Sequence, residues 1–320
     1  MTTPKKVAVV GGTGFLGSHL VEHLLSTGHQ VLAVSRGVRR VNPLPDHPLL
    51  TFEAADICDR ASIHAALRTF HPEVVYHLAC EPDGGESPDH IHACLDSNTR
   101  GTVNTLLATI ASDASLFVFA DSSKVYGNGP VPFRSTQPED PICSYAIAKA
   151  AGWRLCSLLA SRCNVKIVGL RPTFIYGPRQ NFNLLTYVEQ SARNNQPIKI
   201  QGGSQTRDLL YVKDAVLCFA AMMEAPRAWG RSIPIGGGFE INTHDLCREI
   251  LSVLGSDMEI YGDSMAIRQT EIWRSYCDNA EICEVAPWSP RVSLREGLHL
   301  TFFSSLTQPE PVFRLEPLAI

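Results

Sequence analysis

Short, nearly unbroken apolar runs alternate along this chain with longer segments in which apolar residues recur at helical spacing. The apolar runs cover residues 7–11, 31–35, 50–55, 74–79, 116–121 and 166–172. Between them, the segments around 15–27, 60–70, 98–112 and 144–162 have the spacing of amphipathic helices. Strands without polar alternation fit burial on both faces. The pattern therefore predicts an α/β fold, in which helices cover both faces of a parallel sheet.

The pattern changes after about residue 172. Proline and glycine become denser, as in YGPRQN, QGGSQ and IPIGGG, and the apolar segments become shorter. We expect residues 1–172 to form the sheet domain, and residues 173–320 to form mainly a smaller, less regular α/β substrate domain at the carboxyl edge of the sheet. The helical segment 212–225 predicts a return to the first domain, within a stretch near 205–235.

Composition excludes several classes of protein. The chain has 320 residues, 44% of them hydrophobic and 19% charged, and a net charge of -4, as in an ordinary globular protein. This slight acidity argues against a nucleic-acid surface. No apolar run is long enough to span a bilayer, and a strand begins too early for a signal peptide. The ten cysteines form no C-x-x-C pair, so we expect reduced thiols and a cytoplasmic protein.

The stretch GGTGFLGSHLVEH directly follows the first predicted strand and opens the first predicted helix. Gly11, Gly14 and Gly17 would make the tight turn, admit a pyrophosphate to the backbone and let the helix pack closely on the sheet. The amino terminus of the helix then offers free N–H groups to phosphates. The stretch therefore predicts a dinucleotide site on a Rossmann-type, doubly wound sheet.

The same stretch contains H-x-x-E-H, a pattern of some zinc peptidases. His19, Glu22 and His23 fall on the face opposite the apolar stripe of the predicted helix, on the outside of the sheet and away from the ligand edge. We interpret them as solvated polar residues and expect no metal site.

A catalytic group is predicted by the sequences SSKVYG and SYAIAK. Tyr145 and Lys149 lie one helical turn apart, so both side chains face the same way. A neighbouring ammonium stabilises a phenolate, and lowering a tyrosine pKa by about three units corresponds to roughly 4 kcal/mol. Ser122, at the end of a predicted central strand, can hydrogen-bond the substrate oxygen that exchanges a proton with the Tyr145 phenol. We predict Ser122, Tyr145 and Lys149 as catalytic residues.

With these motifs, nearly the whole chain resembles the extended short-chain dehydrogenase/reductase family, the group of nucleotide-sugar epimerases, dehydratases and reductases. The resemblance rests also on RPTFIYGPR, RDLLYVKD and PWSPRVSLREGL. It implies that the cofactor-binding residues are Gly11, Thr13, Gly14, Phe15, Leu16, Gly17, Ser35, Arg36, Asp56, Ile57, Leu78, Ala79, Cys80, Asn98, Tyr145, Lys149, Pro172 and Thr173. The implied substrate-binding residues are Phe174, Asn181, Arg207 and Arg268, the two arginines gripping a diphosphate rather than forming surface salt bridges.

Several positions depart from the pattern of the family. The second strand ends in Ser35-Arg36 instead of an acidic residue, which favours NADP over NAD, with Arg39 or Arg40 in support. Ser123 and Lys124 replace the Asp-Glu pair of the dehydratases, which disfavours elimination of water. Phe174 replaces an asparagine of many epimerases.

These features predict an NADP-dependent ketoreductase of a nucleotide-activated keto sugar, and NAD is the alternative to NADP as its cofactor. The alternative is a nucleotide-sugar 4-epimerase with retained cofactor. A reductase of a small non-sugar carbonyl and a non-catalytic cofactor-sensing protein are less favoured. The resemblance also implies a homodimer formed through helices 98–112 and 144–162.

Overall fold

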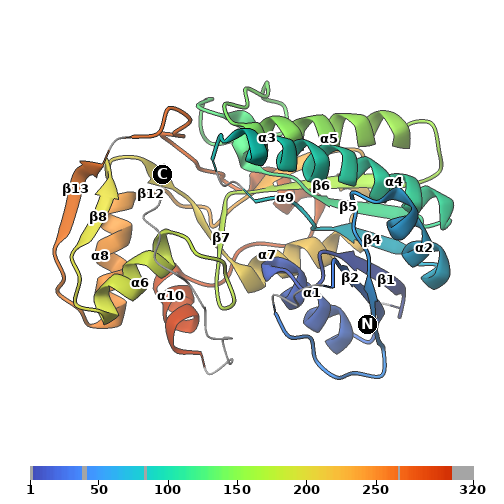
Figure 1. The fold of residues 1–320 in the computed structure, drawn as a ribbon, viewed down its shortest axis with the longest axis horizontal. Helices are drawn as coiled ribbons and strands as arrows, with labels where there is room; N and C mark the ends of the chain where they lie inside the picture. The colour runs from blue at the N-terminus through green and yellow to red at the C-terminus, as the bar shows by residue number, and fades with distance from the viewer. Residues whose placement is uncertain (1–2, 38–41, 83–84, 266, 305–320) are drawn as a thin grey trace.

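The computed structural model describes residues 3–37, 42–82, 85–265 and 267–304. Its centre is a seven-stranded parallel sheet with the order β11-β6-β5-β4-β1-β2-β3 (Figure 1). This is the order of a doubly wound Rossmann sheet, so the predicted fold class is confirmed. The strands are β1 (Lys6–Val10), β2 (Gln30–Ser35), β3 (Leu50–Ala54), β4 (Val74–His77), β5 (Leu116–Ala120), β6 (Lys166–Pro172) and β11 (Ser232–Ile235).

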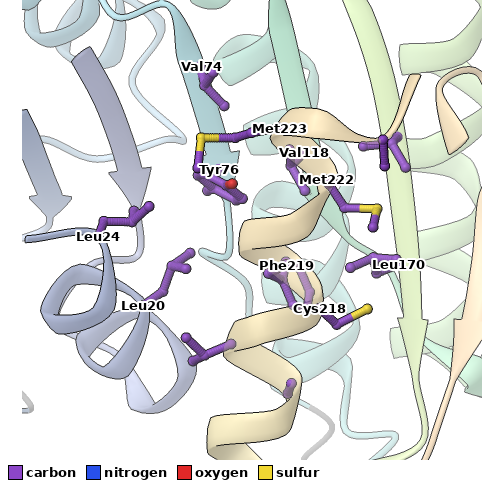
Figure 2. Packing of buried hydrophobic residues seen from close by; sticks show 14 of the residues in the cluster. Leu20, Leu24, Val74, Tyr76, Val118, Leu170, Cys218, Phe219, Met222 and Met223 are labelled. Atoms are coloured by element: carbon purple, nitrogen blue, oxygen red, sulfur yellow. The ribbon is translucent and has the colours of Figure 1, made fainter. Parts of the chain in front are cut away.

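Helices cover both faces of this sheet (Figure 1). One face carries α1 (Phe15–Ser26) and α7 (Val212–Ala221), and the other carries α2 (Arg60–Phe70), α4 (Thr102–Ala111) and α5 (Ser144–Ala160). Alternate residues of the inner strands enter the two cores, so Val9 lies in one and Val10 in the other. Figure 2 shows Phe219 of α7 close to Tyr76 and Val118 of the strands. This two-sided burial explains the unbroken apolar strands.

The predicted helix 98–112 is the end of a longer helical segment. It begins as α3 (Pro88–Cys94), widens into a π-helix η1 (Leu95–Gly101) and continues as α4. α5 approaches η1 closely, because a Cβ on Gly152 would lie 2.5 Å from Asn98 O. Glycine at this position therefore allows the helix of Tyr145 and Lys149 to pack directly against η1.

The second part of the chain builds a smaller, less regular region beside the carboxyl edge of the sheet (Figure 1). Its core gathers buried apolar residues from α6, α8, α10 and the short strands around them. The strands pair as β10 with β7, β12 with β9 and β13 with β8. The elements are β7 (Phe174–Tyr176), α6 (Leu184–Arg193), β8 (Ile198–Gln201), β9 (Thr206–Arg207), β10 (Leu209–Tyr211), β12 (Ile241–Asn242), α8 (Thr243–Leu254), β13 (Ile260–Met265) and α10 (Leu294–Phe303). The helix α9 (Ala280–Val285) instead packs on the large sheet, in the core that also contains α1 and α7.

Among the described residues, three short 3-10 turns complete the elements: η2 (Ser123–Tyr126), η3 (Met222–Glu224) and η4 (Pro226–Ala228). After β10 the chain returns to the large sheet through α7, η3 and η4, and β11 then pairs with β6. The sequence pattern did not predict β11 as a strand. The boundaries of the two domains stay a prediction. Within the described residues, every helix falls short of the length and apolar character that crossing a membrane requires.

The prediction of solvated polar residues on α1 is wrong for His19. This side chain is fully buried, because the turn before α6 covers that face of the helix. Its Nε2 lies 2.9 Å from Pro178 O, and its Nδ1 lies 2.8 Å from a guanidinium nitrogen of Arg179. The same guanidinium donates two bonds to the Glu22 carboxylate. The structure finds no group of three or more potential metal ligands among the residues it describes.

The contacts of His19 fix its protonation state. A guanidinium only donates, so Nδ1 accepts from Arg179 and the proton sits on Nε2, which donates to Pro178 O. Burial is the main cause that lowers the pKa of His19 to about 4, and the Arg179 and Lys213 charges act in the same direction. The bond to Pro178 O opposes this shift. A neutral imidazole therefore ties α1 to the turn that leads into α6.

We predict that His19 makes the protein less stable in mild acid. The folded pKa of about 4 lies below the ordinary 6.5, so the folded state binds fewer protons than the unfolded chain between these values. The free energy of unfolding should fall as pH decreases through this window, by about 1.4 kcal/mol per pH unit from His19. Denaturant unfolding at several pH values measures this slope.

The His19→Gln variant keeps a donor for Pro178 O and removes the titrating group. The dependence of its unfolding free energy on pH should be weaker than that of the wild type by the contribution of one proton, about 1.4 kcal/mol per pH unit. His92→Gln replaces an exposed histidine of α3 and should leave the slope unchanged. Equal slopes for the wild type and His19→Gln would contradict the assignment.

Candidate functional site

The glycine loop joins β1 to α1 and is pressed between neighbouring backbones. Gly11 has a φ of +91°, and a Cβ there would lie 2.6 Å from Ala79 N. A Cβ on Gly17 would lie 2.1 Å from Gly11 O, so only glycine lets the helix start this close to the turn. Gly14 is the N-cap residue and supplies no side-chain cap. The first N–H groups of α1 are thus left for an anion, and this cradle fits the pyrophosphate of a dinucleotide.

The ends of β2 and β3 carry the residues predicted to select the cofactor. Ser35 Oγ is buried and has no hydrogen-bond partner among the described residues, whereas the Arg36 side chain is exposed. Arg39 and Arg40 lie outside the described residues. Asp56 accepts a hydrogen bond from Cys58 N at 2.8 Å.

The end of β4 forms the opposite side of the glycine loop. Leu78 and Ala79 both donate their backbone N–H groups to Val10 O, and Cys80 is exposed after them. Asn98 uses both ends of its amide on the backbone of Glu81, at 2.8 and 2.9 Å. Asn98 therefore positions the loop after β4. Its predicted contact with the cofactor stays a prediction.

The predicted catalytic residues lie together at the carboxyl end of β5. Lys149 is buried, and its Nζ donates to Ala120 O at 2.8 Å. The same Nζ lies 5.8 Å from the centre of the Tyr145 ring and 5.1 Å from that of Phe119. Ser122 follows two residues after Ala120 and caps η2, its Oγ accepting from Lys124 N at 3.2 Å. Two side chains from α5, and Ser122 from the turn after β5, thus lie at the edge of the sheet where ligands of such folds bind.

A buried charged network lies directly beside this group. Arg171, at the end of β6, donates to Asp121 Oδ2 at 2.7 Å and also pairs with Glu139. Its guanidinium bonds the Tyr126 hydroxyl at 2.9 Å, and Ser232 of β11 donates to Asp121. Burial raises the pKa of Asp121, and the charge of Arg171 opposes this shift. The network fixes the segment 121–126 that contains Ser122.

The predicted substrate residues are less closely gathered. Pro172, Thr173 and Phe174 join β6 to β7, and Thr173 Oγ1 is buried without a partner among the described residues. Asn181 and Arg268 are exposed.

Arg207 lies in β9 and is already paired. Its guanidinium contacts Glu271 and donates to Thr206 O and Ile272 O, each at 2.9 Å. From the sequence, a salt bridge is the alternative to phosphate binding by Arg207, and the contact with Glu271 resembles that alternative. The phosphate role of Arg207 stays a prediction.

Sequence reasoning missed four polar residues of the site: Asp121, Asn128, Glu139 and Glu271. Asp121 could have been found, because it is a charged residue at the end of a predicted central strand. The other three lie in irregular segments, and their partners are far away in the sequence. Asn128, for example, bonds the backbone of Glu271, 143 residues later. No local signal points to such a contact.

Comparisons with known proteins agree with this geometry. Residues 7–236 match the family model described as "NAD dependent epimerase/dehydratase family". The chain is 30% identical over 316 residues to a UDP-glucose 4-epimerase of Mycolicibacterium smegmatis, covering 95% of this chain and 100% of that relative.

Two solved structures extend the likeness to three dimensions. UDP-glucose 4-epimerase of Thermus thermophilus, in complex with NAD, has a TM-score of 0.83 and 26% identity and covers 92% of this chain and 97% of its own. UDP-glucuronic acid 4-epimerase of Bacillus cereus, in complex with UDP-glucuronic acid and NAD, has a TM-score of 0.86 and 25% identity, with the same coverage. These proteins support the epimerase alternative better than the ketoreductase.

The matched motifs, the order of the sheet and the relatives agree over almost the whole chain. The chain belongs to the NAD-dependent epimerase/dehydratase family and is an enzyme of the extended short-chain dehydrogenase/reductase type.

Proposed function

We propose that the protein is a nucleotide-sugar 4-epimerase that retains a nicotinamide cofactor. The observation that carries this proposal is the convergence of Lys149, Tyr145 and Ser122 at the end of β5. Lys149 Nζ lies 5.8 Å from the centre of the Tyr145 ring and donates to Ala120 O, two residues before Ser122. The named epimerases with similar chains support a UDP-sugar as substrate.

The residues of the chain have separate tasks in this reaction. When bound, a nicotinamide supplies reversible uptake of a hydride from the sugar carbon. Tyr145 Oη takes the proton of the sugar hydroxyl as that carbon is oxidised, and returns it when the carbonyl is reduced from the other face. The Lys149 ammonium stabilises the phenolate, and Ser122 Oγ orients the reacting oxygen. Arg207 and Arg268 would anchor the diphosphate, so that remote binding energy holds the sugar.

The same site argues against dehydration. Elimination of water needs an acid and a base beside the sugar, and the residues after Ser122 are Ser123 and Lys124. A serine hydroxyl and a lysine ammonium do not replace the acid and base of an Asp-Glu pair.

Arg36 supports a second candidate, the NADP-dependent ketoreductase. An exposed arginine at the end of β2 attracts a 2'-phosphate, which NAD lacks. The two candidates differ in whether the cofactor is exchanged. A reductase consumes added NADPH in step with its sugar, whereas an epimerase interconverts two sugars with no net consumption.

We predict that Tyr145→Phe lowers the turnover of UDP-glucose to UDP-galactose by roughly 10²–10⁴-fold, because the proton acceptor is lost. The ring remains, so the bound cofactor and the melting temperature should change little. Chromatographic separation of the two UDP-sugars measures the rate, and UDP-glucuronic acid serves as a second substrate.

Tyr187→Phe is the matched control, since it removes a phenol hydroxyl on α6 that accepts from Lys199 N. It should keep wild-type turnover. If Tyr145→Phe turned over either substrate at the wild-type rate, the assignment would be wrong.

We also propose that the protein is a homodimer formed through α5 and the neighbouring η1. The face of α5 that contains Ile147, Leu155 and Leu158 is exposed, with values of 50%, 42% and 50%. Leu95 of η1 is likewise 46% exposed, and η1 packs against α5. A second copy would cover this apolar stripe.

The double variant Leu155→Asp/Leu158→Asp should sediment as a monomer at micromolar concentration, whereas the wild type should sediment as a dimer. Charges placed in an apolar interface remain unpaired and weaken association. Leu217→Asp changes an exposed leucine of α7 and should leave the dimer intact. A monomeric wild type, or a dimeric double variant, would refute this interface.

A further inference from the structure

A short segment without regular secondary structure, residues 271–276, connects the two parts of the chain. We call it the strap. On one side it meets β9: Thr206 N donates to Trp273 O at 2.8 Å, and Arg207 donates to Ile272 O. On the other side it meets the loop after η2, where Phe133 N donates to Tyr276 O at 2.8 Å. The strap thus lies between the segment of Arg207 and the segment that follows Ser122.

Asn128 links the strap to that loop through two side-chain hydrogen bonds. Its Nδ2 donates to Glu271 O at 3.0 Å, and its Oδ1 accepts from Trp273 N at 2.8 Å. The two bonds flank Ile272, so the amide pairs with the strap as a neighbouring strand would. An amide is the side chain that can donate and accept side by side in this way.

The loop holds Asn128 in a fixed relation to Ser122. Gly129 N donates to Tyr126 O at 2.9 Å, and the hydroxyl of Tyr126 is bonded by Arg171. Gly127 has a φ of +53°, and a Cβ there would lie 2.0 Å from Asp140 O. This packing leaves the short connection from Ser122 to Asn128 little freedom.

The strap in turn holds Arg207. The Glu271 carboxylate is mostly buried and pairs with the guanidinium, and Ile272 O accepts from it. Asn128 bonds the backbone O of Glu271, and the N–H of Trp273 that it accepts belongs to the same peptide group as Ile272 O. Displacing the strap would therefore turn the guanidinium away from its present direction.

We propose that Asn128 is a positioning residue that sets the Arg207 guanidinium at a defined place relative to Ser122. The inference rests on the proposed function, in which Arg207 anchors the diphosphate while Ser122 and Tyr145 act on the sugar. Asn128 thereby keeps the residue that binds the diphosphate at a fixed distance from the residues that act on the sugar. Asn128 bonds the strap rather than Arg207 or Ser122, so it acts on Arg207 through the strap.

The test compares Asn128→Ala and Asn128→Asp with the wild type. Alanine removes both bonds, and aspartate keeps the acceptor for Trp273 N but places an oxygen against Glu271 O. We expect the Kd for UDP, measured by calorimetry, and the KM for UDP-glucose to rise together by about tenfold, with kcat changed by less than about threefold. Asn128 is exposed, so water can replace its bonds and the melting temperature should fall by only about 2–4 °C.

A double-mutant cycle separates positioning from general loss of stability. Glu271→Gln weakens the hold on Arg207 directly, so Asn128→Ala/Glu271→Gln should bind UDP about as weakly as the worse single variant. Ser293→Ala removes the cap of α10, a comparable loss elsewhere, and should leave the Kd for UDP unchanged.

Two results would overturn the inference and leave the proposed function standing. One is a wild-type Kd for UDP in both Asn128 variants, and the other is a double variant whose loss of UDP affinity equals the sum of the losses of the two single variants. A wild type that binds no UDP at all would remove the proposed function, and the inference with it. The two failures are thereby distinguishable.

Discussion

A buried ammonium at the carboxyl end of β5 is the constraint around which this site is built. Lys149 is 1% exposed, and its Nζ donates to Ala120 O and faces the rings of Phe119 and Tyr145. Removing a cation from water is costly unless neighbouring groups compensate it. A carbonyl, two ring faces and the nearby Asp121 carboxylate provide that compensation, so the charge stays in a fixed place beside the Tyr145 phenol.

The charged network next to Lys149 extends the same principle. Arg171 pairs with two carboxylates, of Asp121 and Glu139, in a region where breaking a pair leaves an uncompensated charge. Because the partners come from β5, β6 and the loop before α5, the network locks together the three segments around the site. The rigid base of the site is thus electrostatic, whereas the sheet beneath it is held by apolar packing (Figure 2).

The sequence predicted most of the sheet and the centre of the site, for a physical reason. Six of the seven strands of the large sheet are apolar runs that neighbouring residues reveal directly. β11 was missed because its four residues include Pro234, which suggests a turn. Its place at the edge of the sheet explains why proline is tolerated. Tyr145, Lys149 and Ser122 were recognisable because helix spacing and a strand end define their positions locally.

Other parts of the site depend on segments that meet only in the fold. The helical pattern placed His19 on the solvent side of α1, and nothing near it in the sequence shows that Pro178 and Arg179 cover that side. We predicted that Arg207 binds a phosphate, but its guanidinium is already paired with Glu271. Bonds to described residues use three of the five N–H donors of this guanidinium. The predicted phosphate contact of Arg207 would have to use its other donors.

The proposed reaction requires a nicotinamide dinucleotide to lie against the glycine loop, next to Lys149. Mass spectrometry of the small molecules released when freshly purified protein is denatured tests this. We expect about one nicotinamide dinucleotide per chain from the wild type, and much less from Lys149→Met, which loses the ammonium beside the site. The mass also distinguishes NAD from NADP. A folded wild type that releases no dinucleotide, and binds neither NAD nor NADP when they are added, would contradict the account.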